Sequence, residues 1–112
     1  MQFLMIICHD KYFISTNTLI AEILEWNNAM TIRKIRRYGH TLAPARDGMT
    51  VRIRKGKRVL KKGSFTASKE IIAAYELIEC ENFDEAVDVA STHPMARFAT
   101  IEVRPVQIDL TI

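Results

Sequence analysis

The sequence predicts an α+β fold in which two helices cover one face of a β-sheet. Strand-like segments alternate with two helical segments, and a hairpin lies between the two helical segments. Of the 112 residues, 48% are hydrophobic and 26% are charged, which is ordinary for a globular protein. A chain of this length is expected to form one domain over residues 1–112.

The first predicted strand, residues 3–8, reads F-L-M-I-I-C and is apolar on both of its faces. This pattern is typical of a central strand. Crossing a bilayer takes roughly 20 apolar residues, and no export-signal features flank the run. We therefore expect a buried strand in a cytoplasmic protein without a membrane partner. Cys8 and Cys80 lack metal-ligand spacing and are predicted to be reduced, buried thiols.

A helix is predicted after the first strand. Candidate N-caps lie at residues 15–18, and apolar residues then recur with helical spacing over residues 19–38. Gly39 is predicted to end this helix, although weak helix formers at Asn27 and Asn28 allow a break. Residues 40–48 are predicted to form a loop.

Three further strands are predicted before the second helix. Residues 50–54 read T-V-R-I-R and return as residues 58–62 after a turn at 55–57. Residues 71–80 form the next strand, and residues 100–106 form a last strand that follows the second helix.

Asn82 and Glu85 have the spacing of a helix cap, and the helix that follows is expected to end before Pro94. Its predicted apolar stripe consists of Phe83, Ala86, Val87 and Ala90. The order is therefore β-α-β-β-β-α-β. Two helices can cover only one face of the sheet, so we expect a second copy of the chain to cover the other, as a homodimer.

Three segments resemble one known family. They read K-K-G-S-F-T-A-S-K-E, E-N-F-D-E-A-V-D-V-A and H-P-M-A-R-F-A-T-I-E-V-R-P-V. With these motifs the chain resembles the YCII-related superfamily in its DGPF-type branch, most closely over residues 63–106. Lys62, Ser64 and Ala67 depart from the family's Asp, Pro and Glu.

The resemblance implies a ferredoxin-like sandwich that pairs its sheets face to face in a dimeric α/β barrel, with one pocket per subunit. Some YCII-like proteins carry a histidine in the first helix, suggested to pair with an aspartate. This chain has no histidine there. No zinc spacing, phosphate loop or dinucleotide fingerprint occurs in the sequence, so we predict neither a metal nor an organic cofactor.

His93 is the predicted catalytic residue, because a histidine in a turn before proline can serve as an acid or base. Arg97 and Arg104 are predicted to bind an anionic group. A helix-ending role for His93, contacting the last carbonyls, is the alternative.

The loop that contains Phe65 and Glu70 is a second predicted ligand contact, and Gly63 suggests a positive φ there. Phe65 alternatively anchors the loop in the core. Glu102 and Arg104, together with Glu76, are placed on the non-core side of their strands. They form either a polar pocket or a salt-bridge network of a dimer.

Twelve of the 16 Lys and Arg residues lie within residues 33–62, with a single acid, Asp47. Little aromatic sequence is interleaved with them, which disfavours nucleic-acid binding and favours a solvated face. We therefore expect a protein that binds or acts on a small polar or anionic molecule. The alternatives are a non-catalytic ligand-binding or regulatory module and, less favoured, nucleic-acid contact through this basic segment.

Overall fold

The structure, a computed structural model, describes residues 1–65 and 69–112. Its strands and helices are β1 (Gln2–His9), α1 (Asn17–Ile32), β2 (Arg36–Thr41), β3 (Met49–Arg54), β4 (Lys57–Lys62), β5 (Ile71–Glu79), α2 (Phe83–Ser91) and β6 (Thr100–Pro105). Two short 3₁₀ helices, η1 (Ala45–Asp47) and η2 (Pro94–Arg97), lie in connections. The family departure at Ala67 lies outside the described residues.

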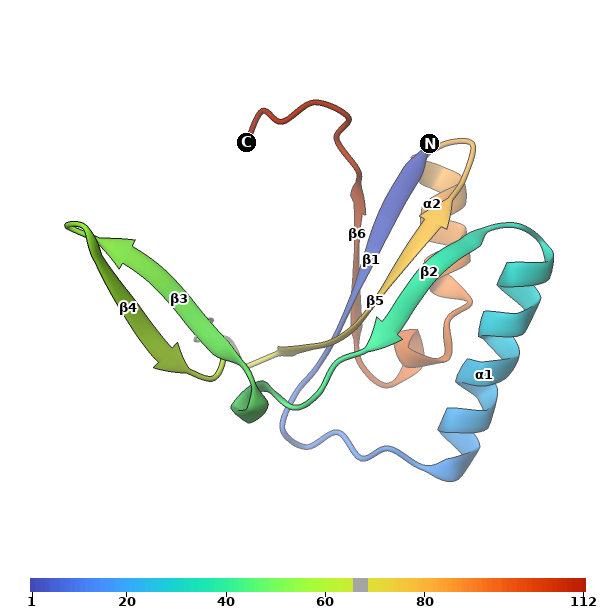
Figure 1. The fold of residues 1–112 in the computed structure, drawn as a ribbon. Helices are drawn as coiled ribbons and strands as arrows, with labels where there is room; N and C mark the ends of the chain where they lie inside the picture. Colours follow the sequence, from blue (N-terminus) through green and yellow to red (C-terminus); the bar gives the residue numbers. More distant parts are fainter. Residues whose placement is uncertain (66–68) are drawn as a thin grey trace.

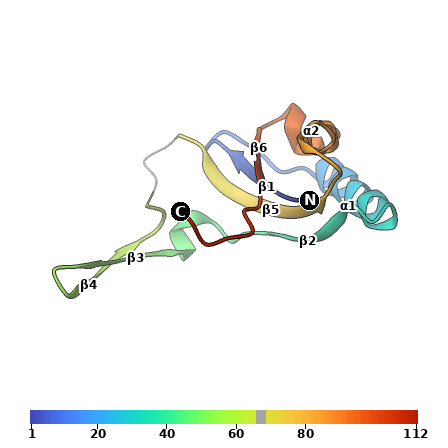
Figure 2. The ribbon, with the colours of Figure 1, turned by 90° about the horizontal axis from the view of Figure 1, so that it is seen from above.

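Four strands form the main sheet in the order β2-β5-β1-β6, and all neighbouring strands are antiparallel. Helices α1 and α2 both lie against one face of this sheet (Figures 1 and 2). Two β-α-β units combined in this order make a ferredoxin-like α+β fold, so the predicted fold class is confirmed. Strand β1 lies inside the sheet, as its apolar sequence predicts.

The core lies between the sheet and the two helices. Phe3 and Met5 of β1 are fully buried and belong to one cluster with Trp26 of α1 and Ala86 of α2. Both helices begin at a side-chain cap. Thr16 Oγ1 accepts a hydrogen bond from the Leu19 N–H, and Asn82 Oδ1 accepts one from the Glu85 N–H.

The prediction of a helix through Tyr38 is wrong, because α1 ends at Ile32 and residues 36–41 form strand β2. Lys34 has a φ of 61°, and the Ile35 N–H donates to the Met30 carbonyl at 2.9 Å, so the chain turns sharply there. Gly39 consequently lies within a strand. The spacing of Ile35 and Tyr38 suits a helix, but Ile35 packs in the core at the entrance to β2.

Strands β3 and β4 form a separate two-stranded sheet that projects from the body of the protein, here called the arm (Figures 1 and 2). The turn at its tip, Lys55-Gly56, has positive φ at both residues, the geometry of a type I′ hairpin turn. The predicted hairpin is therefore confirmed, but it adds no strand to the main sheet. With β2 included, the element order is β-α-β-β-β-β-α-β.

The apolar stripe of α2 differs from the predicted one. Ala86, Val89 and Ala90 are buried, whereas Phe83 and Val87 are 45% and 39% exposed. Both sets satisfy helical spacing, so only the packing of α2 on β1 and β6 decides between them.

Cys80 is buried and Cys8 is half-buried, and both are free thiols. Among the helices of the described residues, none has the length and apolar composition needed to span a membrane.

Candidate functional site

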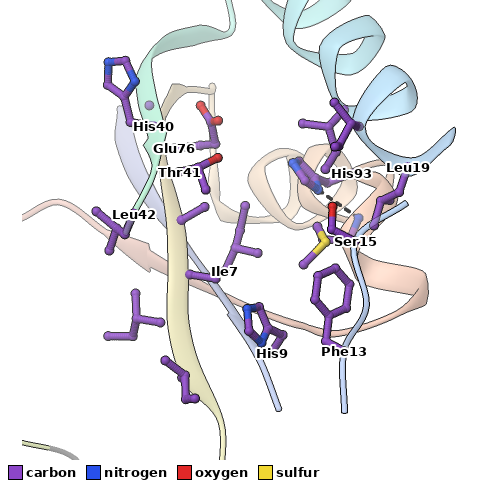
Figure 3. Close-up of a pocket in the computed structure, with 18 of the residues that line it drawn as sticks. Ile7, His9, Phe13, Ser15, Leu19, His40, Thr41, Leu42, Glu76 and His93 are labelled. Atoms are coloured by element: carbon purple, nitrogen blue, oxygen red, sulfur yellow. Dashed lines mark hydrogen bonds between the residues drawn. The ribbon is translucent and has the colours of Figure 1, made fainter. Parts of the chain in front are cut away.

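A cavity of about 900 Å³ lies between α1, the connections that flank it, and the β2–β5 side of the sheet. Its walls are mainly apolar. Leu19 and Ile23 of α1 line one side, and Ile7 of β1 and Ala74 of β5 line the other. His9 and Phe13 stack on each other, with ring centroids 4.7 Å apart, along the cavity wall (Figure 3).

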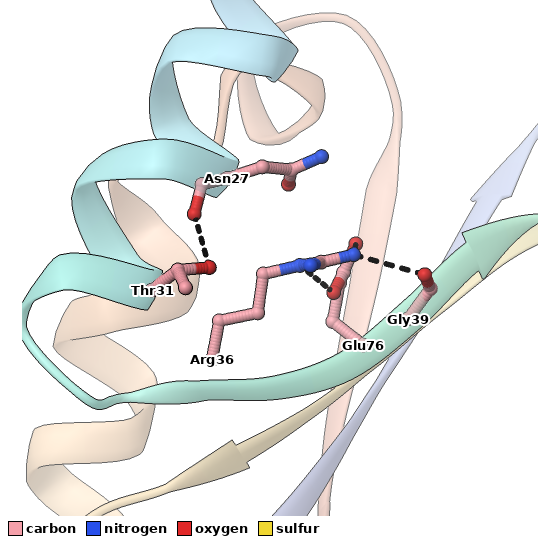
Figure 4. Close-up of polar contacts among 5 residues, drawn as sticks. All are labelled: Asn27, Thr31, Arg36, Gly39 and Glu76. Atoms are coloured by element: carbon pink, nitrogen blue, oxygen red, sulfur yellow. Dashed lines mark hydrogen bonds and ion pairs between the residues drawn. The ribbon is translucent and has the colours of Figure 1, made fainter.

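A buried ion pair lies on the sheet side of this cavity. Arg36 Nε donates to Glu76 Oε2 at 2.6 Å, and Arg36 Nη2 donates to the Gly39 carbonyl at 2.9 Å (Figure 4). Glu76 is 5% exposed, and this burial raises the pKa of its carboxyl, an effect that Arg36 opposes. Because the opposite charges are paired, Arg36 and Glu76 add polar atoms to the cavity but little net charge.

Gly39 is required beside this pair. A Cβ at Gly39 would lie 2.0 Å from Glu76 Oε2 and 2.6 Å from the Tyr75 carbonyl oxygen. The missing side chain therefore makes the space through which the Glu76 carboxylate reaches Arg36. Gly39 serves the site by its small size and does not end a helix.

Asn27 of α1 contributes an unpartnered acceptor. Its side chain lines the cavity and extends from α1 above the Arg36–Glu76 pair (Figure 4). Its Oδ1 is buried and accepts no hydrogen bond from any described residue. A buried acceptor without a donor is costly, so this atom points to a ligand or water that donates to it.

His93 reaches the cavity from the side opposite Glu76 (Figure 3). The residue is 2% exposed, and its ring meets the Trp26 ring at an angle of 64°, with centroids 4.6 Å apart. The Met95 N–H donates to His93 Nδ1 at 3.0 Å, which assigns the proton of the neutral ring to Nε2. Burial lowers the pKa of His93 to about 4, so near pH 7 the ring is neutral and offers an Nε2–H donor.

Of the six predicted site residues, all within the described ranges, only His93 lines this cavity. Arg97 is exposed and forms a salt bridge with Glu22 of α1. Phe65 is 65% exposed and does not anchor its loop in the core. Glu70 accepts a hydrogen bond from Thr100 Oγ1 at 2.6 Å.

Glu102 and Arg104 pair with each other at 2.7 Å on an exposed side of β6. Glu76 does not share their side of the sheet, contrary to the prediction. It lies opposite Met5 in the strand register and faces the helices, where the alternation of β1 buries Phe3, Met5 and Ile7. The predicted positive φ of Gly63 is confirmed at 92°.

Sequence reasoning missed Asn27 and Arg36. It selected Glu76 as a polar residue of a pocket or salt-bridge network, but on the wrong face of the sheet and with the wrong partners. One signal was available for Asn27: it follows Ile23 by four residues, so it shares the apolar side of its helix. Arg36 had no such signal, because it was assigned to a helix end crowded with cations. Glu76 interrupts an apolar strand, but nothing in the sequence indicates its partner.

Comparison with solved structures gives a similar chain, the 5-chloro-2-hydroxyhydroquinone dehydrochlorinase (TftG) from Burkholderia phenoliruptrix AC1100, in complex with 2,5-dihydroxybenzoquinone. The two chains share 17% sequence identity with a TM-score of 0.50, over 96% of this chain and 94% of TftG, which supports the fold. Comparison with curated proteins gives no match. The YCII-related domain matches residues 1–108, nearly the whole chain, and this protein therefore belongs to the YCII-related domain family.

Proposed function

We propose that this protein binds a small, neutral molecule with an apolar body and a hydroxyl group in the cavity between α1 and the sheet. The observation that carries the proposal is the buried, unpartnered Oδ1 of Asn27 in a mainly apolar cavity. A ligand hydroxyl would donate to this atom. The volume of about 900 Å³ falls within the range of about 300–1,000 Å³ that small-molecule pockets have.

His93 supplies the complementary group. Its Nε2–H would donate to an oxygen of the ligand, so the cavity offers one acceptor, Asn27 Oδ1, and one donor, His93 Nε2–H. With a pKa of about 4, His93 is uncharged near pH 7, and we propose that it orients and polarises the ligand oxygen.

A neutral ligand is favoured over an anion at the buried end of the cavity. Arg46 of η1 also lines the cavity, but it is exposed. Arg36, the cation beside the buried end of the cavity, is neutralised by Glu76. Arg97 and Arg104, the predicted anion-binding residues, each pair with a carboxylate as well. The TftG complex contains 2,5-dihydroxybenzoquinone, which supports a ring-shaped ligand that carries oxygen groups.

Thermal unfolding with added ligands tests the proposal, because a ligand that binds the folded state raises Tm by mass action. Hydroquinone and cyclohexanol serve as neutral hydroxyl-bearing compounds and benzoate as an anion. We expect hydroquinone to raise Tm more than benzoate at equal concentration. Loss of one buried hydrogen bond, in Asn27→Leu, should weaken hydroquinone binding about tenfold.

Asn28→Leu is the matched control, because Asn28 is the next residue of the same helix and is exposed. It should bind hydroquinone like the parent protein. Equal binding by both variants, or a larger shift with benzoate, would reject the proposed site.

We also propose that the open face of the main sheet pairs with a second copy, as in the dimeric barrel that the family resemblance implies. Leu4 and Ile6 of β1 lie opposite Leu77 and Tyr75 of β5 on this face, and none of the four is fully buried. Glu102 and Arg104 would then lie at the interface. Light scattering of the parent protein should give twice the mass of one chain. Leu77→Asp should give the mass of a single chain.

A further inference from the structure

The arm has two chemically different faces. Residues directly opposite each other in an antiparallel pair place their side chains on the same side. The register pairs Val51 with Leu60, Ile53 with Arg58 and Met49 with Lys62, so one face carries the four apolar side chains Met49, Val51, Ile53 and Leu60. The other face carries Arg54 opposite Lys57.

The apolar face of the arm is open to solvent within one chain. Met49, Val51, Ile53 and Leu60 are 57%, 60%, 59% and 46% exposed. A two-stranded hairpin is marginally stable in water without a surface to pack on. A contiguous exposed apolar patch next to cations marks an interaction surface.

Charge identifies the surface that complements the arm. Residues 33–62 hold twelve of the 16 cations and one of the 13 acids, so the rest of the chain holds four cations and twelve acids. Five of these acids lie on or directly before α2, with no Lys or Arg between residues 70 and 96: Glu79, Glu81, Asp84, Glu85 and Asp88.

The exposed side of α2 also offers apolar contact. Phe83 and Val87 are four residues apart, hence on one side of the helix, and both are substantially exposed. Asp84 and Asp88 follow them with the same spacing and are exposed as well. This surface matches the apolar face of the arm, where Arg58 and Lys62 accompany the four apolar side chains.

The arm of a chain does not meet its own α2, because the two lie at opposite ends of the molecule in both views (Figures 1 and 2). We propose that the apolar face of the arm docks on the α2 surface of a second copy of this chain. Oligomers of one chain are commonly two-fold symmetric, so each copy would give one arm and receive one. This contact uses α2 on the helix-covered side of the protein and is distinct from the open face of the main sheet.

Charge reversal tests the pairing directly. The arm variant is Arg58→Glu/Lys62→Glu, and the α2 variant is Asp84→Lys/Asp88→Lys. Each variant alone sets like charges against each other in both contacts of a symmetric dimer. We expect each to weaken self-association at least tenfold in sedimentation equilibrium, with the circular dichroism of the folded chain retained.

Mixing the two variants should restore association. In the mixed dimer, the reversed arm meets the reversed α2 surface, and the two unchanged surfaces meet each other. The matched control is Arg54→Glu/Lys57→Glu, which makes the same charge change on the other face of the arm and should leave association unchanged.

Association that is equal in all variants, or lost only in Leu77→Asp, would overturn the arm contact and leave the sheet contact in place. A monomeric parent protein at micromolar concentration would overturn both.

Mixed RNA and DNA oligonucleotides at about 0.15 M salt provide the remaining test. Suppose that the parent protein binds these oligonucleotides tightly and that Arg54→Glu/Lys57→Glu abolishes this binding. If the arm and α2 variants then leave self-association unchanged, the partner of the arm is a nucleic acid and not a second copy of the chain.

Discussion

The cavity and the arm both carry cations next to apolar side chains, but Arg36 at the cavity is compensated and largely buried, whereas the cations of the arm are exposed to solvent. In the cavity, Arg36 is bound to Glu76 and to a backbone carbonyl, and the charge of each side chain is compensated. On the arm, cations alternate with apolar residues in solvent. None of the salt bridges found among the described residues includes a cation of the arm.

The difference follows from the hydration of the charged side chains. A charge in solvent is stabilised by hydration and needs no partner, whereas a buried charge without a partner costs several kcal/mol. Changes in the cavity should therefore alter folding stability and ligand binding. Changes on the arm should leave the fold intact and alter association with a partner.

Breaking the Arg36–Glu76 pair should have the largest effect. Arg36→Met leaves Glu76 buried without its partner, so we expect a loss of about 3–5 kcal/mol in the free energy of unfolding. Arg37→Met is the matched control, because Arg37 is the next residue and is exposed. It should change stability by less than about 0.5 kcal/mol. Urea denaturation measures both values.

The double variant Arg36→Met/Glu76→Leu sharpens the comparison. Replacing both members of a buried pair with apolar residues is often nearly neutral, so the double variant should recover most of the stability lost in Arg36→Met. Additive losses in the two substitutions would contradict a coupled pair.

The next largest effect should be a pH dependence of the free energy of unfolding that is caused by His93. Its pKa in the folded protein, about 4, lies below the ordinary value of 6.5, so folding favours the neutral ring. The resulting stability is fully present above pH 6.5 and is lost as the pH falls through 4, by roughly 3 kcal/mol in total. Denaturation at a series of pH values should show this decline.

Glu76 acts in the opposite direction over the same range. Its pKa is raised above 4.5, so its contribution is present below pH 4.5 and declines as the pH rises. Comparison with His93→Asn, which retains an acceptor for the Met95 N–H but does not titrate, isolates the contribution of the histidine. A His93→Asn profile as steep as the parent's would contradict the assignment.

Much of the fold could be predicted because it depends on local signals. The apolar run of β1, the Asn82 cap and the Lys55-Gly56 turn each specify a structure through their nearest neighbours. Strand β2 could not be predicted in this way. Its apolar residues suit a helix, and it becomes a strand only because β5 offers an edge to which it pairs.

The site was less predictable than the fold for the same reason. His93 stands out because a histidine before proline is distinctive in sequence. Arg36 and Glu76 are 40 residues apart and meet only after β2 and β5 pair, and Asn27 is brought to them by the packing of α1. Contacts between such distant residues leave no periodic pattern in a single sequence.

Gly39→Ala should destabilise the protein by about 1–3 kcal/mol, the usual cost of forcing extra atoms into a packed site. The new Cβ would collide with Glu76 Oε2 and with the Tyr75 carbonyl. In a Glu76→Ala background, which already lacks the ion pair, adding Gly39→Ala should cost less than it does in the parent protein. The shortened side chain vacates the space and leaves only the collision with the Tyr75 carbonyl. Urea denaturation of both variants checks this, and a neutral Gly39→Ala would show that β2 can shift away from β5.

The smallest effect is expected at the base of the arm. Gly63 has a φ of 92°, its N–H donates to the Gly48 carbonyl at 2.9 Å, and its carbonyl accepts from Thr50 Oγ1 at 2.8 Å. A Cβ at Gly63 meets only ordinary contact, 3.7 Å from the Ala45 carbonyl oxygen, so the cost of Gly63→Ala comes from the backbone conformation. We expect a loss of about 1 kcal/mol in the free energy of unfolding.

Lys62→Ala, one residue earlier on the exposed strand β4, should stay within about 0.5 kcal/mol of the parent. Because Gly63 joins the arm to the body while Lys62 lies on the arm itself, Lys62→Ala should instead weaken self-association. Equal stability of the two variants would mean that the base of the arm relaxes freely, and that its direction is not set by Gly63.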